Sequence, residues 1–154
     1  SEIQPPPWGV QTFGFPKLVQ PILNKHCIKC HDGTKDKGKG PDLRPGSKEA
    51  EVFVPNVYTI NGDGYKRFYK YNSYWNLLKY IKWADINQYS TPPGTWGSRV
   101  SPLMKHLAKG HKKVKLSQAE WHTLCAWIDC NVPYLDDWRK YSVDPAVRKM
   151  AKKH

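Results

Sequence analysis

The chain has 154 residues and carries 25 lysines and arginines against 13 acidic residues, a formal charge of +12. Apolar residues make up 39% and aromatic residues 13%, which excludes a disordered basic tail and predicts one compact domain. The apolar runs are far shorter than the ~20 residues of a membrane-spanning helix, so we expect no membrane span. Residues 1–5 show no signal-peptide pattern, and we expect a soluble chain that was processed or cut from something larger.

The predicted elements begin with an extended N-terminal arm over residues 1–15, which contains Pro5-Pro6-Pro7. A first helix is expected from about Pro16 to Cys30, and Pro21 is tolerable only within its opening turn. Apolar residues recur there at helical spacing, namely Leu18, Val19, Ile22, Leu23 and Cys27. Residues 32–47 are expected to form a loop.

A small β-hairpin is predicted over about residues 52–71. Val52 to Ile60 and Tyr65 to Tyr71 are rich in β-branched and aromatic residues, and the Asn-Gly-Asp-Gly sequence of residues 61–64 separates them. A second helix is expected from Ser73 to about Trp83.

Two more helices are expected in the last third of the chain. Ser101-Pro102 starts a short helix, with Ser as the N-cap and Pro at the first position, and Gly110 ends it. The final helix opens with the capping box Ser117-Gln118-Ala119-Glu120, and Asn131 and Pro133 stop it. The fold class is therefore predicted to be mainly α.

The motif with the most specific chemistry is Cys27-Ile28-Lys29-Cys30-His31. A C-x-x-C-H sequence is the covalent attachment signature of c-type haem, because two thiols one turn apart can bond to the porphyrin edge while the histidine ligates the iron. Three alternatives remain open: a thioredoxin-like redox pair, a zinc site completed by Cys125 and Cys130, or chance.

The surroundings of the motif favour haem. A redox dithiol would follow a strand, whereas here a predicted helix precedes the motif, and Gly33, Gly38, Gly40 and Pro41 break the chain after it. This order is the one expected of a class I cytochrome c, with a domain over residues 16–138 and a mobile basic tail over 139–154.

The second axial position of the iron decides what a haem can do. The candidates after the motif are Met104, His106, His111, His122, Met150 and His154. His122 is expected to be packed or on the surface, and Met150 and His154 lie in the tail. We favour His111 as the distal ligand, because it stands after Gly110 in the loop that enters the final helix. Met104 is the alternative ligand, although core packing suits it better, and an open or water-filled position also remains.

These residues and several others also carry a resemblance to a known family. The segments that carry it are Val19 to Leu23, Cys27 to His31, Gly97-Ser98, Ser101 to Leu103, Gly110-His111, Val114 to Ser117, Trp127 to Asp129, Asn131 and Pro133-Tyr134. Over most of residues 6–138 the chain resembles the cytochrome c-like haem domain of the hydrazine synthase alpha subunit and its bacterial relatives. The resemblance implies one covalent haem c, bis-histidine ligation through His111, and a periplasmic or equivalent compartment.

Two departures limit what the resemblance implies. The large propeller-bearing part of the synthase subunit is absent, so synthase chemistry is not expected. Cys125 and Cys130 fall where the relatives have apolar residues. Residues five apart point in different directions on a helix, yet the last turn could unwind in an oxidising compartment, so a disulfide and two free thiols both remain open.

The sequence thus predicts a monohaem cytochrome that carries electrons, with Cys27 and Cys30 as haem anchors, His31 as the proximal iron ligand and His111 as the distal one. It favours an electron carrier over an enzyme without deciding between them. The positive charge favours an acidic redox protein or a larger redox complex as partner, and no nucleic acid. The alternatives are an electron-relay module and a haem enzyme or sensor that binds a small nitrogen or oxygen species. Four aromatic residues could form the walls of its pocket, Trp75, Tyr80, Trp83 and Tyr89.

Overall fold

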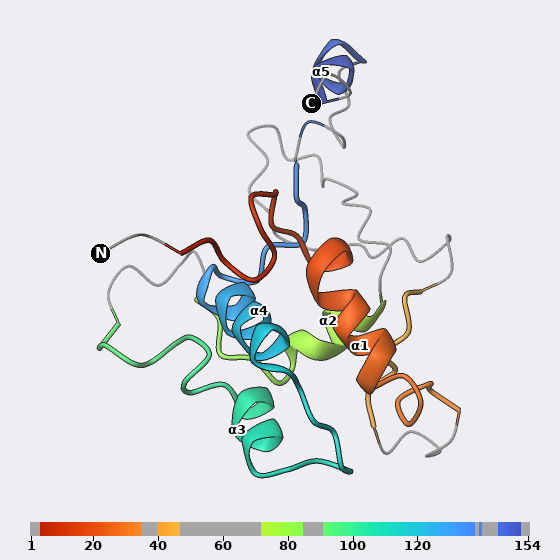
Figure 1. The fold of residues 1–154 in the computed structure, drawn as a ribbon, viewed down its shortest axis with the longest axis vertical. Helices are drawn as coiled ribbons and strands as arrows, with labels where there is room; N and C mark the ends of the chain where they lie inside the picture. Colours follow the sequence, from red (N-terminus) through yellow and green to blue (C-terminus); the bar gives the residue numbers. More distant parts are fainter. Residues whose placement is uncertain are drawn as a thin grey trace, which may run out of the picture.

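The computed structural model describes residues 4–34, 40–46, 72–84, 91–137, 139 and 145–151. Within those ranges the fold is helical and has no strand, which confirms the mainly α prediction there (Figure 1). The predicted hairpin over residues 52–71 lies outside the described residues. The elements are the π-helical turn η1 (Phe15–Val19), α1 (Gln20–His26), α2 (Asn72–Leu78), α3 (Pro102–Ala108), α4 (Gln118–Asp129) and α5 (Pro145–Ala151).

The first helix is shorter than predicted and has two parts. Pro16 and Pro21 each lie in the opening turn of their element, η1 and α1, where a missing backbone N–H is tolerated. α1 ends at His26 and not at Cys30, because residues 27–31 form a separate turn. The haem motif therefore follows the helix and is not part of it.

α2 ends at Leu78, five residues before the predicted end at Trp83. The backbone beyond it bonds to another segment: the N–H of Leu103 donates to the carbonyl of Tyr80 (2.9 Å), and the N–H of Gly97 donates to the carbonyl of Lys82 (2.8 Å). These tertiary hydrogen bonds replace the bonds that would have continued the helix.

α3 and α4 begin where the sequence predicts. Pro102 opens α3, but the Ser101 hydroxyl does not cap it, because this hydroxyl donates to the Gly97 carbonyl (2.7 Å) and accepts from the Lys82 N–H (3.0 Å). The capping box of α4 is present in full between Ser117 and Glu120.

The core is built around Phe15, which is fully buried. Its ring lies 5.1 Å from that of Tyr74, 5.2 Å from that of Trp127 and 6.2 Å from that of Tyr134, measured between centroids. Its N–H donates to the carbonyl of Pro133 (3.1 Å). Phe15, the last residue of the predicted arm, thus joins η1 to α2 and α4.

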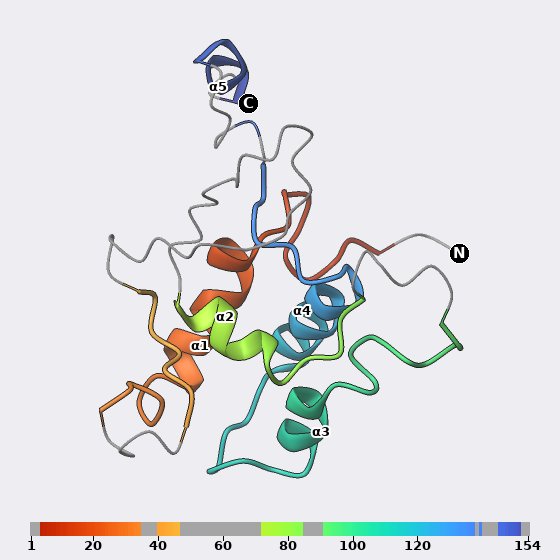
Figure 2. The same cartoon turned by 180° about the vertical axis from the view of Figure 1, so that it is seen from behind.

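α5 lies within the segment predicted to be a C-terminal tail, and Figures 1 and 2 both show it apart from the other helices. Its side chain at Met150 is exposed. In the part of the chain that the structure describes, no helix is long and apolar enough to cross a membrane.

A buried amide ties the loop over residues 40–46 to the helices. Gln20 is 3% exposed, and its Nε2 donates to the Leu43 carbonyl (3.0 Å) and to Oδ1 of Asn24 (2.8 Å). Its Oε1 accepts the hydroxyl proton of Ser73, which is fully buried on α2. One side chain therefore connects α1, α2 and the loop that follows the C-x-x-C-H motif.

Substitution of Gln20 by Ala is expected to lower the free energy of unfolding by about 2–3 kcal/mol, because it leaves the Ser73 hydroxyl and the Leu43 carbonyl buried without a partner. Gln11→Ala is the matched control, since Gln11 is exposed and donates only to the Trp8 carbonyl, and its effect is expected to stay within about 0.5 kcal/mol. Urea unfolding of the two variants measures the difference. Equal losses of unfolding free energy in Gln20→Ala and Gln11→Ala would contradict a stabilising role for the hydrogen bonds of Gln20.

Candidate functional site

The C-x-x-C-H motif forms one tight turn at the end of α1. The N–H of Cys27 donates to the Leu23 carbonyl (2.8 Å), which continues the helical pattern by one residue. The Cys27 carbonyl then accepts from the N–H groups of Cys30 (3.1 Å) and His31 (2.9 Å). The two cysteines and the histidine are therefore held on a single turn, as covalent attachment of a haem requires.

This turn forms one wall of a cavity of about 470 Å³, which lies within the size range of cofactor and ligand sites. His31 and His111 both line it, although they are far apart in the sequence. Most of the other walls are apolar. The lining residues are His26, Cys27, Lys29, Cys30, His31, Gly40, Pro41, Leu43, Leu77, Tyr80, Pro102, Leu103, His106, Leu107, His111, Lys112 and Val114.

The two histidines that the sequence predicts as iron ligands face one cavity. Their ring centroids lie 5.9 Å apart, with an angle of 30° between the ring planes. A bond from metal to imidazole nitrogen is about 2 Å, so two imidazoles on opposite sides of one metal ion would have centroids roughly 6 Å apart. The spacing of His31 and His111 fits a metal ion between them.

Gly40 fixes the ring of His31. A Cβ atom at Gly40 would lie 2.9 Å from Nδ1 of His31, so no larger residue fits there without displacing the ring. Nδ1 is buried and has no hydrogen-bond partner among the described residues, which leaves Nε2 as the nitrogen available to the cavity. The His31 carbonyl also accepts from the N–H of Leu43 (2.9 Å).

His111 is held by a turn that follows α3. Gly110 has a φ of 84°, a left-handed value that glycine adopts without strain, and it reverses the chain direction. The N–H of Val114 donates to the His111 carbonyl (2.8 Å), and the two residues between them, Lys112 and Lys113, also have positive φ values of 46° and 65°. This turn brings His111 back against α3.

The electrostatic surroundings keep His111 neutral. Burial lowers its pKa below the ordinary value, and the neighbouring His106, His31 and Lys112 lower it further. Nδ1 of His111 lies 2.7 Å from Nε2 of His106. A neutral imidazole is the form that binds a metal ion.

Cys27, the first cysteine of the motif, does not have the lowered pKa of a nucleophilic redox thiol. Burial raises the pKa of Cys27 to about 11, and the adjacent Cys30 contributes to the rise. A thioredoxin-like pair needs a lowered thiol pKa, because the thiolate is the nucleophile. The structure therefore argues against that alternative.

Cys125 and Cys130 do not join the motif or each other. All four cysteines are free thiols, and α4 stays helical through Asp129, so the last turn does not unwind to bring these two sulfurs together. Among the described residues, which include every cysteine, no three His, Cys, Asp or Glu side chains are grouped to hold a metal ion. The four-cysteine zinc site is therefore not formed.

Of the other candidate ligands, His106 also lines the cavity, whereas Met104, His122 and Met150 do not. Met104 is 4% exposed in the core and does not line the cavity. His122 is exposed on α4, and Met150 is exposed on α5. His154 lies outside the described residues. Of the candidates weighed for the distal side, only His111 both lines the cavity and approaches the ring of His31 so closely.

The aromatic residues considered for the pocket wall are dispersed. Tyr80 lines the cavity, whereas Trp75 packs against the core and Trp83 is 38% exposed. Tyr89 lies outside the described residues. The apolar walls are mostly aliphatic, and their position could not be predicted from the sequence, because they come from segments that meet only in the folded chain.

Two contacts beside the predicted ligands were not foreseen from the sequence. His106 was a candidate ligand, but its contact with His111 depends on the reversal at Gly110. Gly40 was assigned only a chain-breaking role, although it lies close to the His31 ring in the fold.

Glu120 links the end of α1 to the start of α4. Its Oε1 accepts from Nζ of Lys25 (2.7 Å) and from Nε2 of His26 (3.0 Å), while Oε2 accepts from the Ser117 N–H (2.8 Å). Burial alone would raise the pKa of Glu120, but the hydrogen bonds from Lys25, Ser117 and His26 outweigh it and lower the pKa from 4.5 to about 2. The carboxylate thus fixes the residue before Cys27.

The cavity brings the two thiols of the motif together with imidazole groups and mostly apolar walls, which are the kinds of group that hold a haem c. Comparison of the chain with protein-family models, with curated proteins and with solved structures finds no match. A functional conclusion therefore depends on the residues of the cavity.

Glu120→Gln is expected to lower the free energy of unfolding by about 1–2 kcal/mol at pH 7, because the ion pair with Lys25 is lost and the hydrogen bond with His26 no longer involves a carboxylate, while the capping bond remains. Since the folded pKa is depressed, the contribution of ionised Glu120 is present above about pH 4.5 and is lost as the pH falls toward 2. Urea unfolding from pH 2 to 7 should show the two proteins converging at the acidic end. A difference that stays constant with pH would contradict the assignment.

Proposed function

We propose that the chain is a monohaem c-type cytochrome that carries electrons between protein partners. Cys27 and Cys30 would anchor the haem covalently, His31 would be its proximal ligand and His111 its distal ligand. The observation that carries the proposal is that His31, on the same turn as both thiols, faces His111 across one largely apolar cavity at a centroid distance of 5.9 Å.

A bound haem would supply reversible one-electron exchange at its iron. The chain's own residues would determine how that exchange proceeds. Two imidazoles leave no position for a substrate, so electrons would pass through the cavity mouth to another protein. Imidazole in place of a thioether on the distal side lowers the reduction potential, because a methionine ligand raises it.

The arrangement of helices supports a class I cytochrome c-like fold. α1 directly precedes the C-x-x-C-H turn, a glycine-containing loop follows, and η1 joins this first helix to the last long one, α4. The family resemblance stated for the sequence points to the same fold. Covalent haem attachment belongs to an oxidising compartment, so we place the protein in a periplasm or its equivalent.

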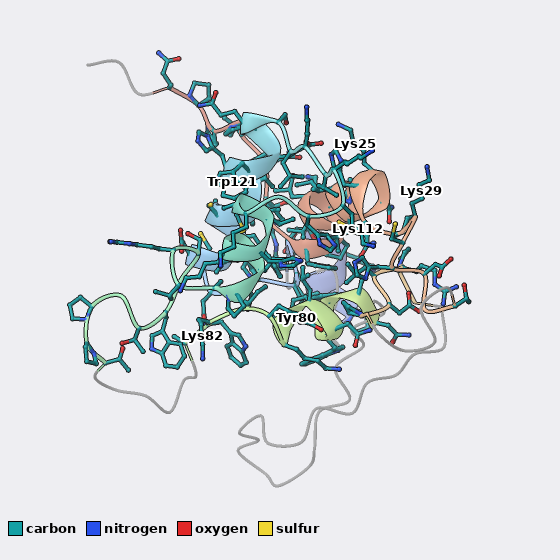
Figure 3. The ribbon with its side chains drawn as sticks, turned by 90° about the horizontal axis from the view of Figure 1, so that it is seen from below. Lys25, Lys29, Tyr80, Lys82, Lys112 and Trp121 are labelled. Atoms are coloured by element: carbon teal, nitrogen blue, oxygen red, sulfur yellow. The ribbon has the colours of Figure 1, made fainter. Side chains whose placement is uncertain are left out.

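The positive charge supports an acidic redox partner or a larger redox complex. Lys29 and Lys112 line the cavity and are exposed, and Figure 3 shows them on the same side of the molecule. Other exposed lysines lie on α3 and the turn after it, Lys105, Lys109, Lys113 and Lys115. Charges around the mouth of a site steer an oppositely charged partner toward it.

One observation favours the second candidate function, a haem protein that binds a small nitrogen or oxygen species. Lys112 and Lys113 have left-handed backbone conformations, which cost about 1–2 kcal/mol per residue outside glycine. Release of His111 from a metal would let this turn relax and open the distal position. Uptake of carbon monoxide by the unmodified reduced protein would support this function over electron transfer.

His111→Ala is expected to convert low-spin haem absorption bands into high-spin bands that change on addition of carbon monoxide, because the distal position then lacks its ligand. His31→Ala should lose the normal low-spin spectrum even where haem stays attached. Absorption spectra of the oxidised and reduced proteins, purified after expression with a c-type maturation system, measure both effects.

Two further variants complete the spectroscopic experiment. Met104→Ala and His122→Ala are expected to keep low-spin spectra, because neither side chain lines the cavity. A high-spin spectrum in Met104→Ala together with a low-spin one in His111→Ala would make Met104 the distal ligand. Absence of haem from the purified unmodified protein would refute the cytochrome proposal.

Charge reversal of the two cavity lysines, Lys29→Glu with Lys112→Glu, is expected to slow oxidation of the reduced protein by anionic hexacyanoferrate(III) by about tenfold at low ionic strength. Lys17→Glu with Lys149→Glu is the control, since these exposed lysines do not line the cavity. Stopped-flow rates from 10 mM to 500 mM salt are expected to converge, because salt screens exposed charges. Equal slowing by the two pairs would indicate that only net charge matters.

A further inference from the structure

The structure places a third histidine directly behind the predicted distal ligand. Nε2 of His106, on α3, lies 2.7 Å from Nδ1 of His111, and the two ring centroids are 4.4 Å apart. That distance is within the range of a good hydrogen bond between nitrogens. The contact occurs because Gly110 folds the chain back on the helix it has just left.

The hydrogen bond fixes which nitrogen of His111 is available to a metal. Nδ1 is engaged by His106, so Nε2 is the remaining ring nitrogen of a side chain that lines the cavity. A metal needs the lone pair of that nitrogen, so the proton of the neutral ring must be on Nδ1, which then donates to His106. Nε2 of His106 must therefore be the acceptor, and its own proton lies on Nδ1.

We infer that His106 is a positioning residue for His111, and this inference rests on the proposed function. It accepts the Nδ1 proton, selects the tautomer that presents Nε2 to the cavity, and fixes the rotation of the ring. Metal-bound histidines generally donate their second N–H to such a partner, which also makes the ligating nitrogen a better electron donor. His106 itself does not touch the metal.

The contacts around the ring of His111 explain why His106 is its positioning residue. Within the described residues, His106 is the one side chain for which a hydrogen bond to the ring of His111 is found. Lys112 and Lys113 have left-handed backbone conformations, and relief of this strain would favour movement of His111 away from its position. The hydrogen bond to His106 opposes that movement. Loss of the hydrogen bond should therefore weaken the bond between His111 and the metal without removing the ligand.

The test compares His106→Ala, His106→Gln and the control His122→Ala in the haem-loaded protein. The probe is exogenous imidazole, which competes with His111 for the ferric iron. His106→Ala is expected to bind imidazole about 10- to 100-fold more tightly than the unmodified protein, the size of effect typical for loss of such a partner. The reduction potential should rise, because His111 becomes a weaker donor.

His106→Gln distinguishes positioning from simple packing. The glutamine oxygen can accept the Nδ1 proton of His111, so this variant should restore imidazole affinity to within about threefold of the unmodified protein. His122→Ala should leave both quantities unchanged, since His122 is exposed on α4 and does not line the cavity.

Three results would overturn the inference. A low-spin His106→Ala protein with unchanged imidazole affinity and potential would refute the positioning role while the cytochrome assignment stands. Failure of His106→Gln to restore the affinity that His106→Ala alters would assign the effect to packing. A purified protein without covalent haem would refute the proposed function, and the inference with it.

Discussion

The attachment of the loop over residues 40–43 to α1 is the constraint on which the proximal side of the cavity depends. The N–H of Leu43 bonds to the His31 carbonyl, and the Leu43 carbonyl bonds to the buried amide of Gln20. Both the N–H and the carbonyl group of Leu43 are therefore engaged, which holds the loop next to the motif. Gly40 consequently lies close against the ring of His31. The main-chain hydrogen bonds of the loop therefore limit the orientation of that ring, whose own Nδ1 has no hydrogen-bond partner among the described residues.

The side of the cavity that carries His111 is held in place by a different set of contacts. α3 is positioned by backbone bonds between residues 80–82 and 97–103, and the turn after Gly110 then carries His111 over the cavity. Glu120 links α4 to α1, because it caps α4 and at the same time holds the last turn of α1. The cavity thus has one wall fixed by a buried polar network and an opposite wall fixed by a strained turn.

The sequence predicted those features that depend on neighbouring residues. Pro102, Gly110 and the capping box mark the limits of α3 and α4, because caps and breakers act locally. The early end of α2 was not predictable, since hydrogen bonds from residues 97 and 103 replace its continuation. The early end of α1 comes from the separate turn over residues 27–31, which the apolar spacing does not reveal. For the candidate site, the motif and His111 came from spacing and loop position, whereas the contact of His106 with His111 and the fit of Gly40 against His31 arise only after the chain is folded.

The sequence separation of these contacts has a consequence for the order in which the site assembles. The turn with both thiols, α1 and the loop at Leu43 all lie within the first third of the chain and contact one another. His111 reaches its position only through pairings between segments much farther along the sequence. Bringing His111 to His31 closes a much longer loop than bringing Leu43 to His31, and a longer loop has the higher entropic cost, so we expect the wall with His111 to form after the wall with the motif. The thiols of Cys27 and Cys30 would then be accessible to the proposed haem while one side of the cavity has formed and the other has not.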